Sequence, residues 1–230
     1  MFSVRIITIF APVNQIQIIM SPFSNIGNIP FDLNVLATFF PNCKHINEKA
    51  RALESARHIA RLKNGLYVAL PDETGKALSL NLIANHLYGP SYVSRHTALR
   101  HYGLTPEAVF LTQSITTKHS RDFSNSIGDF QYQSCTPEYF PIGVRIIEEN
   151  GVSFLMATPE KALCDTINFC KSLNLRFMKD VAIYLEEDIR FDTDALADFN
   201  LEIIEQCADY SRKQQSINNL IKYIKHEYHI

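Results

Sequence analysis

Near residue 150 the chain changes from a strand-like pattern to a helical one, and this change constrains the fold more than any other feature. Asn150-Gly151 is a dipeptide typical of tight hairpin turns, and apolar and β-branched residues flank it over residues 144–148 and 152–157. Thr158-Pro159 follows directly, which places a capping side chain before a proline at the first helical position. The pattern predicts an antiparallel hairpin that leads into a helix.

The surrounding sequence extends this pattern to a body of residues 73–230. Residues 75–104 are predicted to be helical with a break at Gly89-Pro90. Ser94 is expected to cap the second part of that stretch, and Gly103 is expected to end it. Further strands are predicted at residues 109–111 and 130–132, and further helices at 177–188, 193–209 and 212–228. We therefore expect an α+β chain whose body has a mostly antiparallel sheet and C-terminal helices.

Upstream of the body, two helices are predicted. Asp32 is positioned as the N-cap of an apolar helix over residues 31–40, which Pro41 stops. A longer helix is predicted over residues 47–63, because its apolar residues keep helical spacing.

Asn64-Gly65 then either ends the second helix or turns it into a hairpin, and both interpretations are open. Residues 66–70 read as a short strand closed by Pro71. The order of helix, helix, turn and strand is that of a reduced winged helix, which we assign to residues 31–72.

Basic side chains on the predicted 47–63 helix are the candidate DNA contacts. Arg57 and Arg61 lie one helical turn apart and off the apolar stripe, and a helix-turn-helix places such a helix in the major groove. The candidate DNA-binding residues are Lys49, Arg51, Arg57, His58, Arg61 and Lys63. The alternative is an ordinary small α+β subdomain with a solvated basic face.

Charge is distributed unevenly along the chain. Residues 1–122 contain 12 Lys and Arg against 7 Asp and Glu, whereas residues 123–230 contain 10 against 17. A basic front half favours a polyanionic partner, although a solvated surface also explains such a split.

Residues 1–30 form an N-terminal extension before the predicted winged helix. The first twenty are rich in Ile and Val, but Arg5, Pro12 and several amides keep any apolar run shorter than the ~18 residues that a membrane helix needs. The segment also lacks the clean apolar region and cleavage site of a signal peptide. Two interpretations are open: translation starts at Met20 and residues 1–19 are not part of the protein, or they form a strand-like extension.

The sequence contains none of the common catalytic or cofactor-binding motifs. It has no phosphate-binding loop, dinucleotide-binding glycine pattern, nucleophile elbow or zinc-protease motif. The five cysteines form no CxxC pair, so reduced thiols in a reducing cytosol are expected. The acidic run at residues 186–188 lacks the glycine and spacing of a calcium loop. We expect no enzymatic activity, no cofactor, no metal, no membrane and a cytoplasmic location.

The charged residues after Thr158 are the nearest approach to an acid–base group. Glu160 and Lys161 are adjacent and point to different sides of a helix, and Glu160 suits the first turn. Lys161 and Asp165 are four residues apart, the spacing of a routine helix-supporting pair, so we expect a surface pair.

Two motif blocks of the body resemble AbiEi-type antitoxins. The first is Leu-Tyr-Gly-Pro-Ser-Tyr-Val-Ser at residues 87–94, followed by Ala98-Leu99 and by His-Tyr-Gly-Leu-Thr-Pro at 101–106. The second is Ala-Thr-Pro-Glu-Lys-Ala-Leu-Cys-Asp at residues 157–165. Residues 62–67 also resemble the end of that family's winged helix. The resemblance covers about residues 31–185.

This resemblance implies a type IV toxin–antitoxin module whose toxin is a nucleotidyltransferase-like protein. It implies an antitoxin that represses its own operon by binding promoter DNA through the winged helix, and that opposes the toxin without a stable complex. The motif residues are expected to act as caps and turns: Ser91, Tyr92, Ser94, Gly103, Thr158, Pro159, Glu160, Lys161 and Asp165.

Two other functions stay open. One is a small enzyme whose body acts on a nucleotide or RNA, which a deep pocket with converging titratable groups would favour. The other is a protein-interaction module whose head has lost DNA binding, which a neutral or acidic surface on the 47–63 helix would favour.

Overall fold

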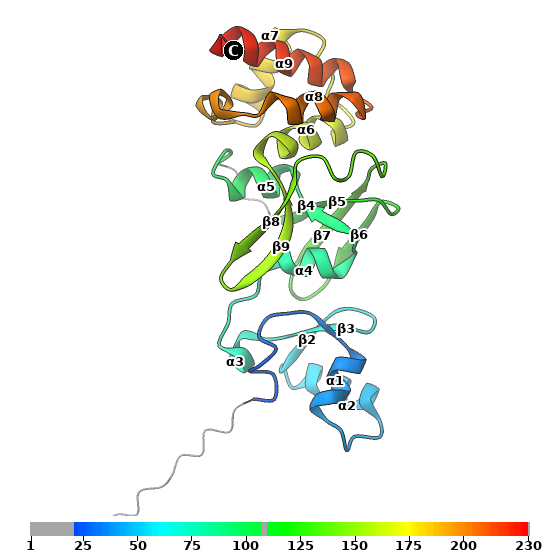
Figure 1. Ribbon diagram of the computed structural model, residues 1–230. Coiled ribbons are helices and arrows are strands. Elements are labelled where there is room, and N and C mark those ends of the chain that lie inside the picture. Colours follow the sequence, from blue (N-terminus) through cyan, green and yellow to red (C-terminus); the bar gives the residue numbers. More distant parts are fainter. Residues whose placement is uncertain (1–20, 107–109, 230) are drawn as a thin grey trace, which may run out of the picture.

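The computed structural model describes residues 21–106 and 110–229, so the two interpretations of residues 1–19 lie outside the described residues. The described chain is a mixed α+β fold with a three-stranded and a six-stranded sheet. Figure 1 shows an N-terminal head, the six-stranded sheet and a group of C-terminal helices stacked in succession.

The head is built from two short helices and a small antiparallel sheet. Its elements are β1 (Phe31–Asp32), α1 (Leu33–Phe39), α2 (Ile46–Ser55), β2 (Ile59–Lys63) and β3 (Leu66–Ala69), with the strand order β1-β3-β2. The Asp32 side chain accepts a hydrogen bond from the Val35 N–H at 2.9 Å, which confirms the predicted cap of the first helix.

The predicted helix over residues 47–63 is wrong in its second half. The helix α2 ends at Ser55, Arg57 has a left-handed backbone with φ of 59°, and β2 begins at Ile59. Asn64-Gly65 therefore turns a hairpin between β2 and β3. The apolar residues of this segment fit both a helical and a strand period, and the pairing with β3 decides between them.

The hairpin of β2 and β3 is buried on both faces. Ile59 and Tyr67 pack into the head core with Leu53 of α2. Ala60 and Val68, which are paired across the hairpin, pack into the core of the body instead. Since successive residues of a strand face opposite sides, one face of the hairpin packs against the head core and the other face against the body core.

The body begins with α3 (Pro71–Thr74) and α4 (Leu80–Leu87), followed by β4 (Ser91–Val93) and α5 (Arg95–His101). The other strands are β5 (Leu111–Thr116), β6 (Arg121–Ser124), β7 (Asp129–Ser134), β8 (Val144–Glu149) and β9 (Val152–Ala157). The turn between β8 and β9 is confirmed, with positive φ at both Asn150 and Gly151. The helix α4 lies between this sheet and the head (Figure 1).

The predicted, mostly antiparallel sheet is corrected to a mixed one. The order is β6-β7-β5-β4-β9-β8, and the β5–β7 and β4–β9 pairs are parallel. The β5–β7 pair is parallel because β6, which comes between them in the sequence, lies on the far side of β7. The β4–β9 pair comes from β4, a three-residue strand inside the stretch predicted to be helical. It follows the confirmed break at Gly89-Pro90 and lies between β5 and β9.

The C-terminal helices are α6 (Pro159–Phe169), α7 (Met178–Ile183), α8 (Leu201–Asp209) and α9 (Gln214–Tyr228). A π-helical turn at Tyr184–Asp188 and a 3-10 helix at Thr193–Asp198 join them. The predicted helical character of the C-terminal region is thus confirmed, but the helix expected over residues 193–209 is divided into the 3-10 helix and α8. In the described part of the chain, no helix combines the length and apolar character needed to cross a membrane.

Candidate functional site

The helix α6 places a lysine and an aspartate together in the interior of the body. Thr158 caps the helix, with its Oγ1 atom 3.4 Å from the Lys161 backbone nitrogen, and Pro159 occupies the first turn. The Lys161 Nζ atom lies 3.4 Å from Asp165 Oδ1, and both side chains are fully buried. The expected surface pair is therefore wrong: the spacing is as predicted, but the pair is inside the protein.

Three hydroxyl groups converge on the Asp165 carboxylate. Ser94 Oγ donates to it at 2.6 Å, Tyr139 OH at 2.7 Å and Tyr92 OH at 3.1 Å. The donors come from β4, from the residue that precedes α5 and from the connection between β7 and β8. The carboxylate thus joins α6 to the centre of the sheet. We call these four residues, together with Lys161, the buried polar cluster.

The ammonium group of Lys161 also contacts Tyr139 in two ways. It donates to the Tyr139 carbonyl oxygen at 3.1 Å and lies 3.0 Å from the centroid of the Tyr139 ring. A buried charge is tolerated only when it is paired and hydrogen-bonded, and Lys161 meets both conditions.

Burial and the nearby carboxylate change the pKa values of the two phenol groups of the cluster. Burial, and then the negative charge of Asp165, raise the pKa values of both Tyr92 and Tyr139 well above their usual range. Both phenols are therefore neutral donors at physiological pH. Because the cluster is fully buried, its contacts favour a role in holding the body together.

Other motif residues have structural contacts of their own. Ser94 occupies the N-cap position of α5, but its hydroxyl serves Asp165 and makes no side-chain cap bond, so the expected cap is corrected. Gly103 has φ of 75°, as expected just after α5. Glu160 accepts the Asn200 N–H at 3.0 Å, and Ser91 Oγ lies 3.5 Å from the Ala84 carbonyl oxygen.

Sequence reasoning missed Tyr139, the third donor to Asp165. It lies in an irregular segment between β7 and β8, where neither a helical nor a strand period marks a residue as buried.

The six candidate DNA-binding residues do not form one helical face, which contradicts the predicted arrangement. Lys49 and Arg51 lie on α2, which also carries Glu48 and Glu54, so the helix has no net charge. The other four follow the end of α2: Arg57, His58, Arg61 and Lys63.

Two of these four, His58 and Arg61, are paired with glutamate side chains. His58 Nδ1 lies 2.6 Å from Glu73 Oε1, and Arg61 Nη2 donates to Glu54 Oε2 at 2.6 Å. The hydrogen bonds from Ser21 and His58 lower the pKa of the Glu73 carboxyl. These contacts tie the segment between α2 and β2 to its neighbours.

A group of three cations lies where the hairpin meets the body, and we call Lys63, Lys118 and Arg121 the basic cluster. Lys63 Nζ donates to the Leu87 carbonyl oxygen and Lys118 Nζ to that of Gly89, each at 2.5 Å. Partial burial, and then the positive charges of Lys118 and Arg121, lower the pKa of Lys63. The carbonyl oxygens that hold the two lysines belong to Leu87 and Gly89, only two residues apart, so the two ammonium groups lie near each other.

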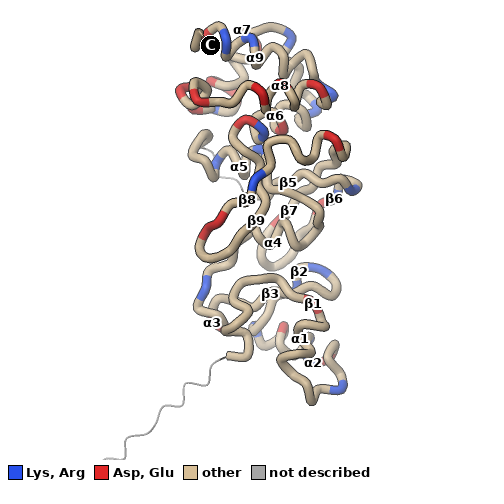
Figure 2. Tube along the Cα trace, viewed as in Figure 1, with Lys and Arg blue, Asp and Glu red and all other residues tan. Residues whose placement is uncertain are grey.

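Aromatic rings support the basic cluster. Lys118 Nζ lies 5.3 Å from the centroid of the Tyr88 ring, and the Arg121 guanidinium carbon lies 4.9 Å from that of Phe123. Figure 2 shows basic residues at the β2–β3 hairpin and near the start of β6, and both acidic and basic residues among the C-terminal helices. Sequence reasoning missed Lys118 and Arg121, although Lys-His-Ser-Arg at 118–121 is a short basic run.

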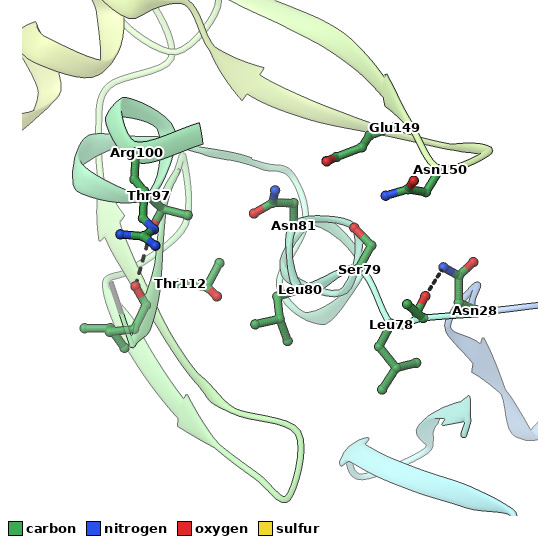
Figure 3. A pocket seen from close by; sticks show the side chains of 12 residues that line it. Asn28, Leu78, Ser79, Leu80, Asn81, Thr97, Arg100, Thr112, Glu149 and Asn150 are labelled. Carbon is green, nitrogen blue, oxygen red and sulfur yellow. Dashed lines mark hydrogen bonds between the residues drawn. The ribbon is translucent and has the colours of Figure 1, made fainter. Parts of the chain in front are cut away.

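A cavity of about 290 Å³, with a mixed polar and apolar lining, lies between α4, α5, β5 and the β8–β9 turn. Figure 3 shows Arg100 and Thr97 on one side of it, and Glu149 and Asn150 on another. Arg100 and Glu149 are the charged lining residues, and the lining includes no His, Cys or Lys.

No protein-family model matches the chain, and no curated protein matches it. Among residues 21–106 and 110–229, no three His, Cys, Asp or Glu side chains gather in a way that could hold a metal ion. Any assignment of function therefore rests on the geometry above and on the resemblance of the motif blocks.

Proposed function

We propose that the protein binds promoter DNA and represses its own operon, as the antitoxin of a type IV toxin–antitoxin module. The observation that carries DNA binding is the basic cluster, which combines a residue at the end of β2 with two residues from the edge of the body. Lys and Arg contacts with phosphates supply most of the sequence-independent affinity for DNA. A cationic face shared by hairpin and body suits a duplex that contacts both.

The order of elements in the head supports the same proposal. Two helices joined by a short turn, then a hairpin whose strand β3 also pairs with β1, follow the order of a winged helix without its first helix. In this arrangement α2 takes the place of the recognition helix, and Arg51 lies on its exposed side. The Asn64-Gly65 turn takes the place of the wing.

Gel shifts of the DNA upstream of the gene, across a salt series, test this proposal. Wild type should bind with an affinity that falls steeply with salt. Lys118→Ala/Arg121→Ala should lower the salt slope by about 2, since each lost phosphate contact lowers it by about 1. Lys171→Ala/Lys222→Ala removes two exposed lysines of the C-terminal region and is the matched control. If the salt slope of Lys118→Ala/Arg121→Ala equals that of wild type, the basic cluster does not contact the DNA.

The neutral charge of α2 favours a second candidate, a protein-interaction module that has lost DNA binding. The same assay separates the two functions. If wild type shows no salt-sensitive binding to the upstream DNA, the repressor proposal fails and the interaction module replaces it.

The antitoxin part of the proposal rests on the resemblance of residues 31–185. A nucleotidyltransferase-like reading frame next to the gene should be toxic when expressed alone, and co-expression of this protein should restore growth. Persistent toxicity at matched expression levels would refute this part and leave the DNA-binding part standing.

A further inference from the structure

A second cavity, of about 490 Å³, lies between the head and the β6–β7 turn of the body. Arg57 and Arg61 both line it, with Glu54 from α2 and Ser126 from the turn. Asn125 Nδ2 donates to the Leu62 carbonyl oxygen at 3.1 Å, which fixes the turn against β2. The two arginines that do not share a helical face therefore share a cavity.

Arg57 has a backbone conformation that suits glycine better than arginine. Its φ of 59° lies in the left-handed region, and it closes α2 through hydrogen bonds from its own N–H to Glu54 O at 3.1 Å and from His58 N–H to Leu53 O at 2.9 Å. Glycine is favoured at this position of a helix C-terminus because a Cβ atom costs conformational free energy there. The Arg57 side chain is exposed, and among the described residues it makes no hydrogen bond, ion pair or ring contact that offsets this cost.

Arg61 has a donor that the fold leaves unused. Its Nη2 atom is paired with Glu54, but its Nε atom is buried and has no hydrogen-bond partner among the described residues. An unsatisfied buried donor costs free energy. This Nε atom has almost no exposed surface, so a ligand acceptor reaches it only if the Arg61 side chain shifts. Two guanidinium groups and one carboxylate give the cavity a net positive charge, and the planar fork of arginine matches the oxygens of a phosphate.

We infer that this cavity binds a phosphate group, held by Arg57 and Arg61 with the Ser126 hydroxyl at its rim. The volume falls within the usual range for small-molecule sites, which is roughly 300–1,000 Å³. The phosphate belongs either to a small phosphorylated compound or to the backbone of DNA. The inference goes beyond the proposed function, because the site exists whether or not the head binds DNA.

Calorimetric titration of the full chain with inorganic pyrophosphate, and gel shifts with the upstream duplex, test the inference. Arg57→Gly is the informative variant, since glycine keeps the left-handed backbone and the protein should melt at the wild-type temperature or above it. Arg61→Gln removes the second guanidinium group of the cavity. Arg176→Gln is the matched control, because Arg176 is an exposed arginine of the C-terminal region that does not line the cavity. Each cavity variant should weaken binding at least tenfold, whereas the control should stay within twofold of wild type.

The two probes identify the source of the phosphate. Loss of pyrophosphate binding in Arg57→Gly with unchanged DNA affinity indicates a small phosphorylated ligand, and it leaves the inference intact even if the duplex is never bound. A parallel loss for both probes, with pyrophosphate competing against the duplex, indicates a DNA phosphate. If Arg57→Gly and Arg61→Gln match wild type for both probes, or wild type binds neither, the inference is overturned.

Discussion

Replacing Asp165 by asparagine should destabilise the protein more than any surface substitution. The side chain keeps its shape and one acceptor oxygen, but the buried Lys161 ammonium group loses its counter-charge. Removing one partner of a buried ion pair costs about 3–5 kcal/mol. For a chain of this length, each kcal/mol lowers the melting temperature by roughly 2–4 °C, so a fall of about 10 °C is expected.

A double-mutant cycle measures how much of this cost belongs to the pair. Lys161→Met leaves the Asp165 carboxylate with its three hydroxyl donors, so its cost should be smaller than that of Asp165→Asn. The double variant removes both charges, and its loss should fall short of the sum of the single losses by about 1 kcal/mol or more. Urea denaturation followed by circular dichroism gives the free energies of unfolding.

The exposed pair Lys225–Glu205 is the matched control, with an N–O distance of 3.2 Å and both side chains about half exposed. Glu205→Gln should change the free energy of unfolding by less than about 1 kcal/mol, because solvent screens surface pairs. If Asp165→Asn is no more destabilising than this control, or if the cycle is additive, the buried charges are not coupled and the reasoning is refuted.

Three further predictions concern α6, its neighbours and pH. Thr158→Ala should lower the free energy of unfolding by about 1 kcal/mol, as lost caps do, without changing DNA binding in gel shifts. Gly143→Ala should cost roughly 1–3 kcal/mol in denaturation experiments, because a Cβ atom there would lie 2.9 Å from Lys161 Cβ; Gly151→Ala, which meets no atom within 4 Å, should cost less. Because the pKa values of Tyr92 and Tyr139 are raised in the folded state, their contribution to stability is complete below about pH 10 and is lost as the pH rises further. Unfolding at pH 9 and 10.5 should show a smaller fall for Tyr92→Phe/Tyr139→Phe than for wild type.

Elements defined by local signals were predictable from the sequence. The caps at Asp32 and Thr158-Pro159 and the turn at Asn150-Gly151 depend on atoms only a few residues away. The residue types at these positions are therefore enough to predict them. The C-terminal helices carry apolar residues at helical spacing, which is also a local property.

Features decided by distant partners were not predictable. Residues 59–63 fit two periods, and only their pairing with β3 makes them a strand. The three residues of β4 are too few to show a period at all. Lys161 and Asp165 have the same spacing in a surface pair and in a buried one, and the difference comes from hydroxyl groups on other elements. The buried polar cluster could therefore not be predicted from the spacing of Lys161 and Asp165 alone.

The position of β4 at the centre of the sheet has a consequence for how the chain is made. Its partner β5 follows within about twenty residues, but its other partner β9 begins only at Val152. At a synthesis rate of about 5–20 residues per second, the roughly 35 residues between the two partners take about 2–7 s to add. During those seconds one edge of β4 is open, and open strand edges pair readily with other chains. Until β9 is made, this edge of the nascent body is open to pairing with another chain.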